Sequence, residues 1–276
     1  MQPLKLYVAA DGYRETKPGE KEACELTRSI IETVNWQCEV KKLYREKNLG
    51  CKAAISSACN WFFENEEEGV ILEDDCLPDP TFFSFCQQML EYFRNEEKIM
   101  HIAGANFQFG RIRGQGSYYF SRNSHVWGWA SWRRAWKYYD VDMRAFPEFK
   151  KTKKINKIVN KWLERAFILN KFEKAYKGKI DTWDYQWNFA IWNQNGLAII
   201  PNKNLISNIG FDKKATHTTT GSSKFSDMST SPIHDITHPS TIEVNVEADD
   251  FSFQAAVKDF FAMKLKGIKN IYGRIF

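Results

Sequence analysis

The stretch Val70-Ile71-Leu72-Glu73-Asp74-Asp75 decides the fold class, because a short apolar strand runs directly into three adjacent carboxylates. In α/β proteins, ligands bind beyond the carboxyl ends of the parallel strands, and the acidic triplet lies at such an end. Three neighbouring carboxylates are costly to fold unless a cation or hydrogen-bond donors compensate their repulsion. Oxygen ligands suit Mg²⁺ or Mn²⁺, so the stretch indicates a divalent-metal site. The alternative is that these acids only cap the helix after Pro80.

Strands and helices alternate on both sides of the triplet over the first hundred residues. Short apolar runs at 4–9 and 39–44 are typical of strands. Apolar residues recur at helical spacing at 22–33, 52–63 and 81–93. This alternation predicts an α/β fold with a mixed, mainly parallel sheet flanked by helices.

The alternation weakens beyond residue 100. Residues 101–136 are rich in glycine and aromatic side chains and fit no clean period. We expect residues 146–179 to be helical, 182–193 to form a tryptophan-rich helix, and 197–200 to form a short strand. The polar stretch 216–239 is expected to be a loop that is mobile without ligand.

Composition limits the classes of protein that are plausible. The chain has 276 residues, of which 43% are hydrophobic and 26% charged, which excludes wholesale disorder and fibrous structure. No apolar run approaches the roughly 20 residues that span a bilayer, and the first residues do not read as a signal peptide. The six cysteines include no CxxC pair. We therefore expect a cytoplasmic protein with reduced thiols.

The basic residues are concentrated in two segments. The net charge is +5, but residues 150–179 alone carry +9 and residues 258–276 carry +4, which leaves the remainder at −8. Such segments favour contact with an anion, either a phosphate-bearing substrate or lipid headgroups. The alternative is that they are solvated helix faces. Nucleic acid is not expected as a partner, because no DNA- or RNA-binding motif accompanies the charge.

Four segments in this order resemble the motifs of one family. They are Arg45 with Asn48-Leu49-Gly50-Cys51, Glu73-Asp74-Asp75 followed by Cys76-Leu77-Pro78-Asp79-Pro80, Trp127-Gly128-Trp129-Ala130-Ser131-Trp132, and Asn208-Ile209-Gly210 running on to Thr216-His217. From residue 4 to about 220 the chain resembles GT-A glycosyltransferases and is most similar to bacterial nucleotide-diphospho-sugar transferases related to N-acetylglucosaminyltransferase I. The resemblance implies a Rossmann-like GT-A catalytic domain over 1–246 and a basic amphipathic helical tail over 247–276.

The resemblance also implies roles for the acidic triplet. Asp75 would bind the Mn²⁺ or Mg²⁺ that bridges the donor diphosphate, and Asp74 would contact the ribose or the sugar, with Glu73 beside them in the nucleotide-sugar site. GT-A enzymes often complete the metal or diphosphate site with a late histidine, which points to His217. A loop histidine without a role is the alternative, and His234 and His238 are weaker candidates.

Further nucleotide contacts are implied near the first strand. Asp11 and Arg14 would hold the base and ribose. Arg45, with Asn48 nearby, would pair with the diphosphate or the base through its fixed fork of donors, although it could equally be a surface arginine.

An inverting transfer needs a carboxylate that takes the proton from the acceptor hydroxyl. We choose Asp184 as this base, with Asp181 as the second choice. The competing interpretation is that Asp181 caps the next helix and that Asp184 is the third residue of that capping arrangement.

The tryptophan cluster offers sugar-stacking surfaces. We expect Trp127, Trp129 or Trp132 to contact the acceptor or the donor sugar, with plain core packing as the alternative. Trp183 and Trp187 are expected to pack in the core.

The resemblance, together with the acidic triplet, implies a metal-dependent glycosyltransferase that moves a sugar from a nucleotide-diphosphate donor to a hydroxyl of a growing surface glycan or glycolipid, and the resemblance alone implies inversion. A metal-dependent phosphoesterase or nucleotidyltransferase and a non-catalytic carbohydrate-binding module remain alternatives. The tail either docks on the domain or lies on the anionic inner face of the membrane.

Overall fold

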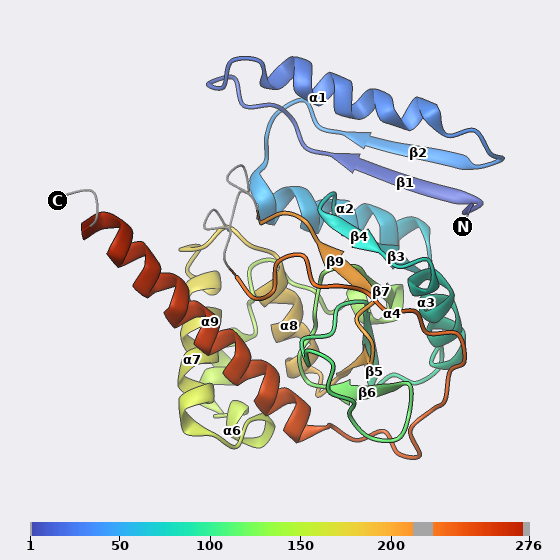
Figure 1. Ribbon diagram of the computed structural model, residues 1–276. Helices are drawn as coiled ribbons and strands as arrows, with labels where there is room; N and C mark the ends of the chain where they lie inside the picture. Colours follow the sequence, from blue (N-terminus) through green and yellow to red (C-terminus); the bar gives the residue numbers. More distant parts are fainter. Residues whose placement is uncertain (1, 212–222, 273–276) are drawn as a thin grey trace.

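The chain has a mixed α/β fold in which helices flank a five-stranded sheet (Figure 1). The structure is a computed structural model that describes residues 2–211 and 223–272. The strands are β1 (Lys5–Ala10), β2 (Glu39–Tyr44), β3 (Glu68–Ile71), β4 (Cys76–Pro78), β5 (Ile99–Ala103), β6 (Tyr118–Ser121), β7 (Trp129–Trp132), β8 (Leu197–Pro201) and β9 (Ile206–Asn208). The helices are α1 (Glu20–Ser29), η1 (Ile30–Thr33), α2 (Gly50–Asn65), α3 (Thr81–Tyr92), α4 (Arg133–Trp136), α5 (Phe146–Lys151), α6 (Ile155–Ile158), α7 (Trp162–Tyr176), α8 (Asp184–Asn193) and α9 (Val246–Tyr272).

The main sheet has the order β3-β7-β5-β8-β6 and is mixed. Of its four pairings, β5 with β8 is parallel, while β3 with β7, β5 with β7 and β6 with β8 are antiparallel. The prediction of a mainly parallel sheet is therefore wrong. The reason lies in β6 and β7, which come from the aromatic segment 101–136 that has no clean period. β7 pairs antiparallel with β3 and β5, and β6 pairs antiparallel with β8, so each runs opposite to its neighbours in the sheet.

The first two strands form a sheet of their own. β1 and β2 pair in parallel from Lys5 opposite Glu39 to Ala10 opposite Tyr44, and α1 connects them. This unit packs on α2, where Tyr7 contacts the rings of Trp61 and Phe62 (Figure 1). The parallel βαβ start expected from the alternation is present, but it is not hydrogen-bonded to the main sheet within the described residues.

An aromatic core fills the space between the main sheet and α8. Trp129 is fully buried and lies against Trp183, with 5.6 Å between the ring centroids. The Trp187 indole donates to Nδ1 of buried His101 (3.1 Å), so Nε2 of that ring carries the proton and donates to the His125 carbonyl (3.0 Å). Burial lowers the pKa of His101 to about 4, and the histidine is a neutral part of the core.

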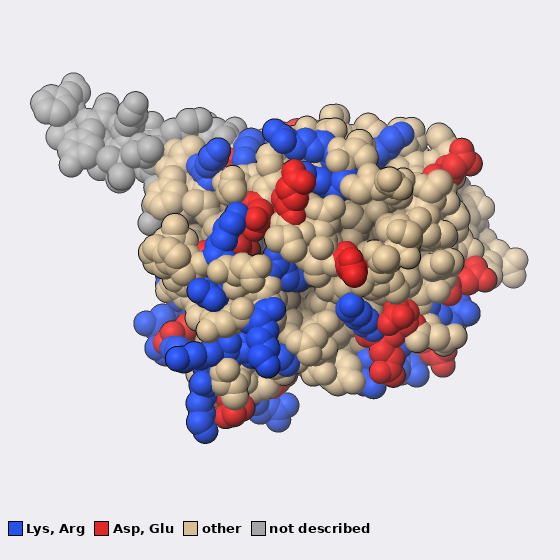
Figure 2. Space-filling view, turned by 90° about the horizontal axis from the view of Figure 1, so that it is seen from below, with Lys and Arg blue, Asp and Glu red and all other residues tan. Residues whose placement is uncertain are grey.

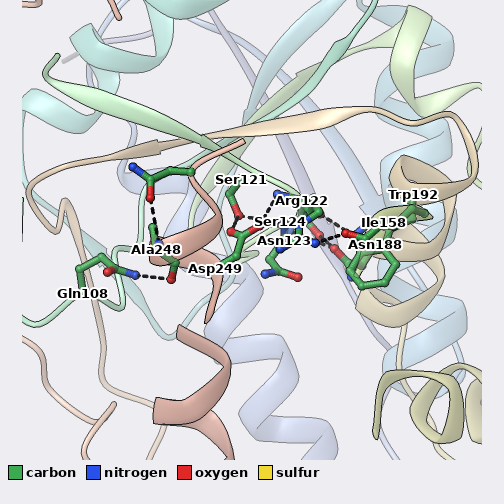
Figure 3. Close-up of polar contacts among 11 residues, drawn as sticks. Gln108, Ser121, Arg122, Asn123, Ser124, Ile158, Asn188, Trp192, Ala248 and Asp249 are labelled. Carbon is green, nitrogen blue, oxygen red and sulfur yellow. Dashed lines mark hydrogen bonds and ion pairs between the residues drawn. The ribbon is translucent and has the colours of Figure 1, made fainter. Parts of the chain in front are cut away.

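The start of α9 is anchored in the domain by a buried ion pair (Figure 3). Asp249 accepts hydrogen bonds from the Ser121 hydroxyl (2.5 Å) and from Nε of Arg122 (2.8 Å). Gln108 donates to the Ala248 carbonyl (3.0 Å) and to the Ser252 hydroxyl (2.7 Å). The first turns of α9 are therefore docked on the domain.

Other expectations for the second half are met more coarsely. The basic stretch 146–179 contains three helices, α5, α6 and α7, rather than one. Residues 223–239, the described part of the expected polar loop, contain no helix or strand. No helix in the described ranges is long and apolar enough to cross a membrane.

Candidate functional site

The acidic triplet lies in the turn between β3 and β4. β4 pairs antiparallel with β9, which sets Cys76 opposite Asn208. The Ile209 backbone N–H donates to the Asp75 carbonyl at 2.9 Å and extends this pairing. The segment 208–210 is thereby tied to the end of the triplet, although about 135 residues separate them in the chain.

Gly210 lies directly against the Asp75 side chain. A Cβ at Gly210 would be 2.3 Å from Oδ2 and 2.9 Å from Cβ of Asp75, which is too close for any real pair of atoms. The Gly210 N–H donates to Oδ1 of buried Asn208 (2.9 Å), which holds the loop in this position. Only glycine leaves room for the Asp75 carboxylate here. The contact between the two segments therefore explains the glycine of the Asn208-Ile209-Gly210 motif.

The pKa of Glu73 is shifted by its surroundings. Its pKa is raised to about 7, first because of burial and then because of repulsion from Asp75, Asp184 and Asp74. A hydrogen bond with the Trp183 side chain opposes the rise in this pKa. Trp183, expected only as core, is buried and also contacts the acidic site.

Asp184 is thus brought to the triplet from a distant part of the sequence. It is the first residue of α8, and its Oδ1 accepts a short hydrogen bond from the Thr182 hydroxyl. Its carboxylate repels Glu73 closely enough to contribute to that pKa shift. The Asp184 carboxylate and the acidic triplet therefore lie close enough for their charges to interact.

Asp181 has a different place from the one expected. Its two oxygens accept the backbone N–H groups of Cys51 (3.0 Å) and Lys52 (3.1 Å), so it caps α2 and not the helix that follows it in sequence. Both carboxylate oxygens of Asp181 are thus engaged by backbone donors of α2. The prediction of Asp181 as the second-choice base is not supported by this geometry.

Asp11 caps the same helix from the other side. It accepts the N–H groups of Leu49 (2.9 Å) and Gly50 (3.2 Å), so the two carboxylates of Asp11 and Asp181 together bind the free N–H groups at the start of α2. The helix start is occupied by protein groups, and the described contacts of the Asp11 side chain are structural.

The basic and amide side chains expected at the nucleotide lie around this helix start. Arg14 pairs with Glu20 through Nε at 3.0 Å. Arg45 donates to the Ser57 hydroxyl (2.8 Å), and Asn48 donates to the Gly12 carbonyl (2.9 Å). Arg28 joins the group by donating to the Asp11 carbonyl and the Arg45 carbonyl. Two of the expected nucleotide-binding residues are thus linked through one arginine that the sequence did not indicate.

The tryptophan motif divides into two core residues and a partly exposed one, since Trp132, like Trp129, is buried (2% exposed) and its indole N–H donates to the Leu90 carbonyl (3.2 Å). Trp129 is 0% exposed, so no sugar can reach it, and the expectation of a ligand contact by this residue is wrong. The β7 strand directs it into the aromatic core, where burial of a large ring is favourable. Trp127 is only partly buried and lies edge-on to Phe107 and Phe211, so it keeps a ring surface that a ligand could contact.

The donor set of the site fits a hard divalent cation. Glu73 and Asp75 supply carboxylate oxygens, and a Mg²⁺ or Mn²⁺ ion would relieve the repulsion that neighbouring acids exert on Glu73. In the described residues no group of three or more His, Cys, Asp or Glu side chains is already gathered in a metal-binding arrangement. His217 lies outside the described residues. His238 stacks on Tyr92 and hydrogen-bonds the Tyr118 hydroxyl.

No protein-family model matches the chain, and no curated protein matches its sequence.

Proposed function

We propose that the protein is a metal-dependent glycosyltransferase of the GT-A type, which transfers a sugar with inversion from a nucleotide-diphosphate sugar to a hydroxyl of a growing surface glycan or glycolipid. The observation that supports the proposal is the proximity of Asp184 to the acidic triplet, where its charge helps to raise the pKa of Glu73. A metal-binding acid and a separate carboxylate base at one site are the groups that such a transfer requires.

Asp75, backed by Gly210, would hold the metal together with Glu73. A bound Mn²⁺ or Mg²⁺ supplies charge neutralisation for the leaving nucleoside diphosphate. Asp184 would take the proton from the acceptor hydroxyl as its oxygen attacks the anomeric carbon and the bond to the diphosphate oxygen breaks. Its place at the first residue of α8, with the Thr182 hydroxyl donating to Oδ1, orients this carboxylate toward the triplet side of the helix start.

The donor would extend from the triplet toward the start of α2. Arg14 and Arg45 are the cations available there for phosphate or base recognition, and Asn48 adds an amide. Because Asp11 already caps α2, its role would be to position this group of side chains. Trp127 would stack on the donor or acceptor sugar. We place the protein in the cytoplasm, where nucleotide sugars are supplied, with the C-terminal tail available to an anionic membrane.

The first test is a thermal-shift screen against nucleoside diphosphates and nucleotide sugars, each with and without Mn²⁺ or Mg²⁺, because a ligand that binds the folded state raises its stability. A metal-dependent shift with one nucleotide family supports the proposal and identifies the donor class. A shift with free glycans alone would instead favour the carbohydrate-binding module.

Two variants then separate the proposed roles. Asp75→Ala should abolish metal-dependent donor binding, measured by calorimetry. Asp184→Asn should leave donor affinity unchanged and lower transfer by about two to four orders of magnitude. Asp142→Asn, at an exposed acid outside the site, is the matched control. Unchanged donor binding by the first variant, or near-parental turnover by the second, would reject the corresponding assignment.

A further inference from the structure

The first turn of α7 presents large apolar side chains to solvent. Trp162 is 67% exposed and Leu163 is 61% exposed, and Ala166, one turn further on the same face, is also exposed. Single exposed apolar residues are ordinary, but adjacent tryptophan and leucine side chains at one helix end form a contiguous apolar surface. Nothing in the proposed glycosyl transfer uses these residues.

This turn is held firmly by the rest of the fold. The other side of α7 is buried through Phe172 and Ala175. Lys161 pairs with Asp250 of α9 at 2.6 Å, and Phe167 lies edge-on to Phe253. The exposed Trp162 indole therefore lies on a helix whose other side is packed against the domain.

Exposed lysines without an ion-pair partner among the described residues precede the turn in the sequence and recur at the far end of α7. The two acids of residues 150–179 do not balance them, since Glu164 is 2% exposed and Glu173 is shared by Lys150 (2.9 Å) and Lys177 (2.6 Å). The exposed lysines that lack an ion-pair partner among the described residues are Lys153 and Lys157 before the turn and Lys174 and Lys179 toward the other end of α7. Figure 2, seen from the side where α6 lies in Figure 1, shows lysine and arginine gathered toward α6 and α7.

We propose that Trp162, Leu163 and the flanking Lys153 and Lys157, here called the α7 surface, dock the protein on an anionic lipid bilayer. Tryptophan favours the interface between headgroups and acyl chains, where its ring is apolar and its N–H remains hydrated. Leucine adds buried apolar area, and lysines are attracted by the negative surface potential. A protein partner is a poorer fit, because lysine is depleted in protein–protein interfaces.

The α7 surface differs from the C-terminal tail as a membrane contact. The α7 surface belongs to the folded domain, so its position relative to the acidic site is fixed by the packing of α7. The tail lies instead at the C-terminal end of the chain. The inference does not rest on the proposed glycosyl transfer, since vesicle binding needs neither nucleotide nor metal.

The test is sedimentation of the full-length protein with vesicles of phosphatidylcholine, alone or mixed with phosphatidylglycerol. We expect binding to the mixed vesicles that weakens as salt is raised, and little binding to the neutral ones. Each lysine contributes about fivefold to partitioning, so Lys153→Glu with Lys157→Glu should weaken it by at least about 25-fold. Trp162→Ser with Leu163→Ser should weaken it by about tenfold or more.

Matched controls exclude general effects of charge and surface apolarity. Lys17→Glu with Lys21→Glu makes the same charge change at two exposed lysines, one in the turn before α1 and one in its first turn, and Ile112→Ser removes another exposed apolar residue. Both controls should bind like the parent, and circular dichroism should show all variants folded.

Three outcomes would overturn the inference. Parental binding by either α7-surface variant would place the contact elsewhere, for example on the tail. Equal loss in the lysine controls would reduce the effect to net charge. Binding to heparin that depends on Lys153 and Lys157 and is indifferent to Trp162 and Leu163, without vesicle binding, would assign the surface to a soluble polyanion.

Discussion

Replacing Gly210 by alanine tests the idea that this glycine makes room for the Asp75 carboxylate, which we propose binds the metal. The added Cβ would lie 2.3 Å from Oδ2 of Asp75, whereas ordinary van der Waals contact begins at 3.4 Å, so the two must separate by about 1 Å. Metal–ligand distances tolerate only about 0.2 Å, and a displacement near 1 Å in an active site can cost about 100-fold in rate. We therefore expect Gly210→Ala to weaken Mn²⁺-dependent donor binding or turnover by about 100-fold, or about 2.7 kcal/mol.

The assay is calorimetric titration of Mn²⁺ and donor, with a denaturation curve to establish that the variant is folded. Ile209→Ala is the matched control, because its side chain is 54% exposed and its backbone N–H still reaches the Asp75 carbonyl. The control should stay within about twofold of the parent, as expected for an exposed surface residue. A folded Gly210→Ala variant with parental Mn²⁺ affinity would refute the reasoning.

Three further predictions concern stability. Burial and neighbouring acids raise the pKa of Glu73 from 4.5 to about 7. Its contribution to the free energy of unfolding is therefore fully present below pH 4.5 and is lost as pH rises through 7. In the absence of metal, Glu73→Gln should show a flatter dependence of melting temperature on pH over about pH 5–8, and an equally steep dependence would contradict the shift. Asp181→Ala removes the acceptor of two N–H groups of α2 and should cost about 1–2 kcal/mol in urea unfolding, whereas no loss would remove its capping role. Asp249→Ala leaves Arg122 buried without its carboxylate and should cost about 3–5 kcal/mol by the same measurement; a loss under about 1 kcal/mol would mean that the pair does not anchor α9.

Local patterns were sufficient for the elements that carry the site. The apolar run before Glu73 is β3, and the tryptophan-rich helix expected at 182–193 is α8 at Asp184–Asn193. Such elements depend on the spacing of apolar side chains along a few turns or a few strand residues, which the sequence records directly. The parallel pairing of β1 with β2 follows from the same alternation.

Contacts between distant segments were beyond that kind of reasoning. Asp181 was expected as the second-choice base, with capping of the helix that follows it as the competing interpretation, yet it caps α2, about 130 residues earlier. Trp129 and Trp127 share a motif, but only Trp127 keeps an accessible ring. Neither outcome has a local signature, because a carboxylate caps whichever helix start the fold brings to it, and a strand residue is buried by whatever packs on its face.

Local patterns in the sequence predict the acidic triplet at a strand end, the secondary structure around it and the clustering of positive charge in 150–179. The folded chain is needed to see that β7 enters the sheet antiparallel, that Gly210 lies against Asp75, and that Asp184 lies near Glu73. The physical reason is range. Periodicity and charge are properties of neighbouring residues, whereas strand direction, close packing and a shifted pKa arise from burying side chains from distant segments against one another.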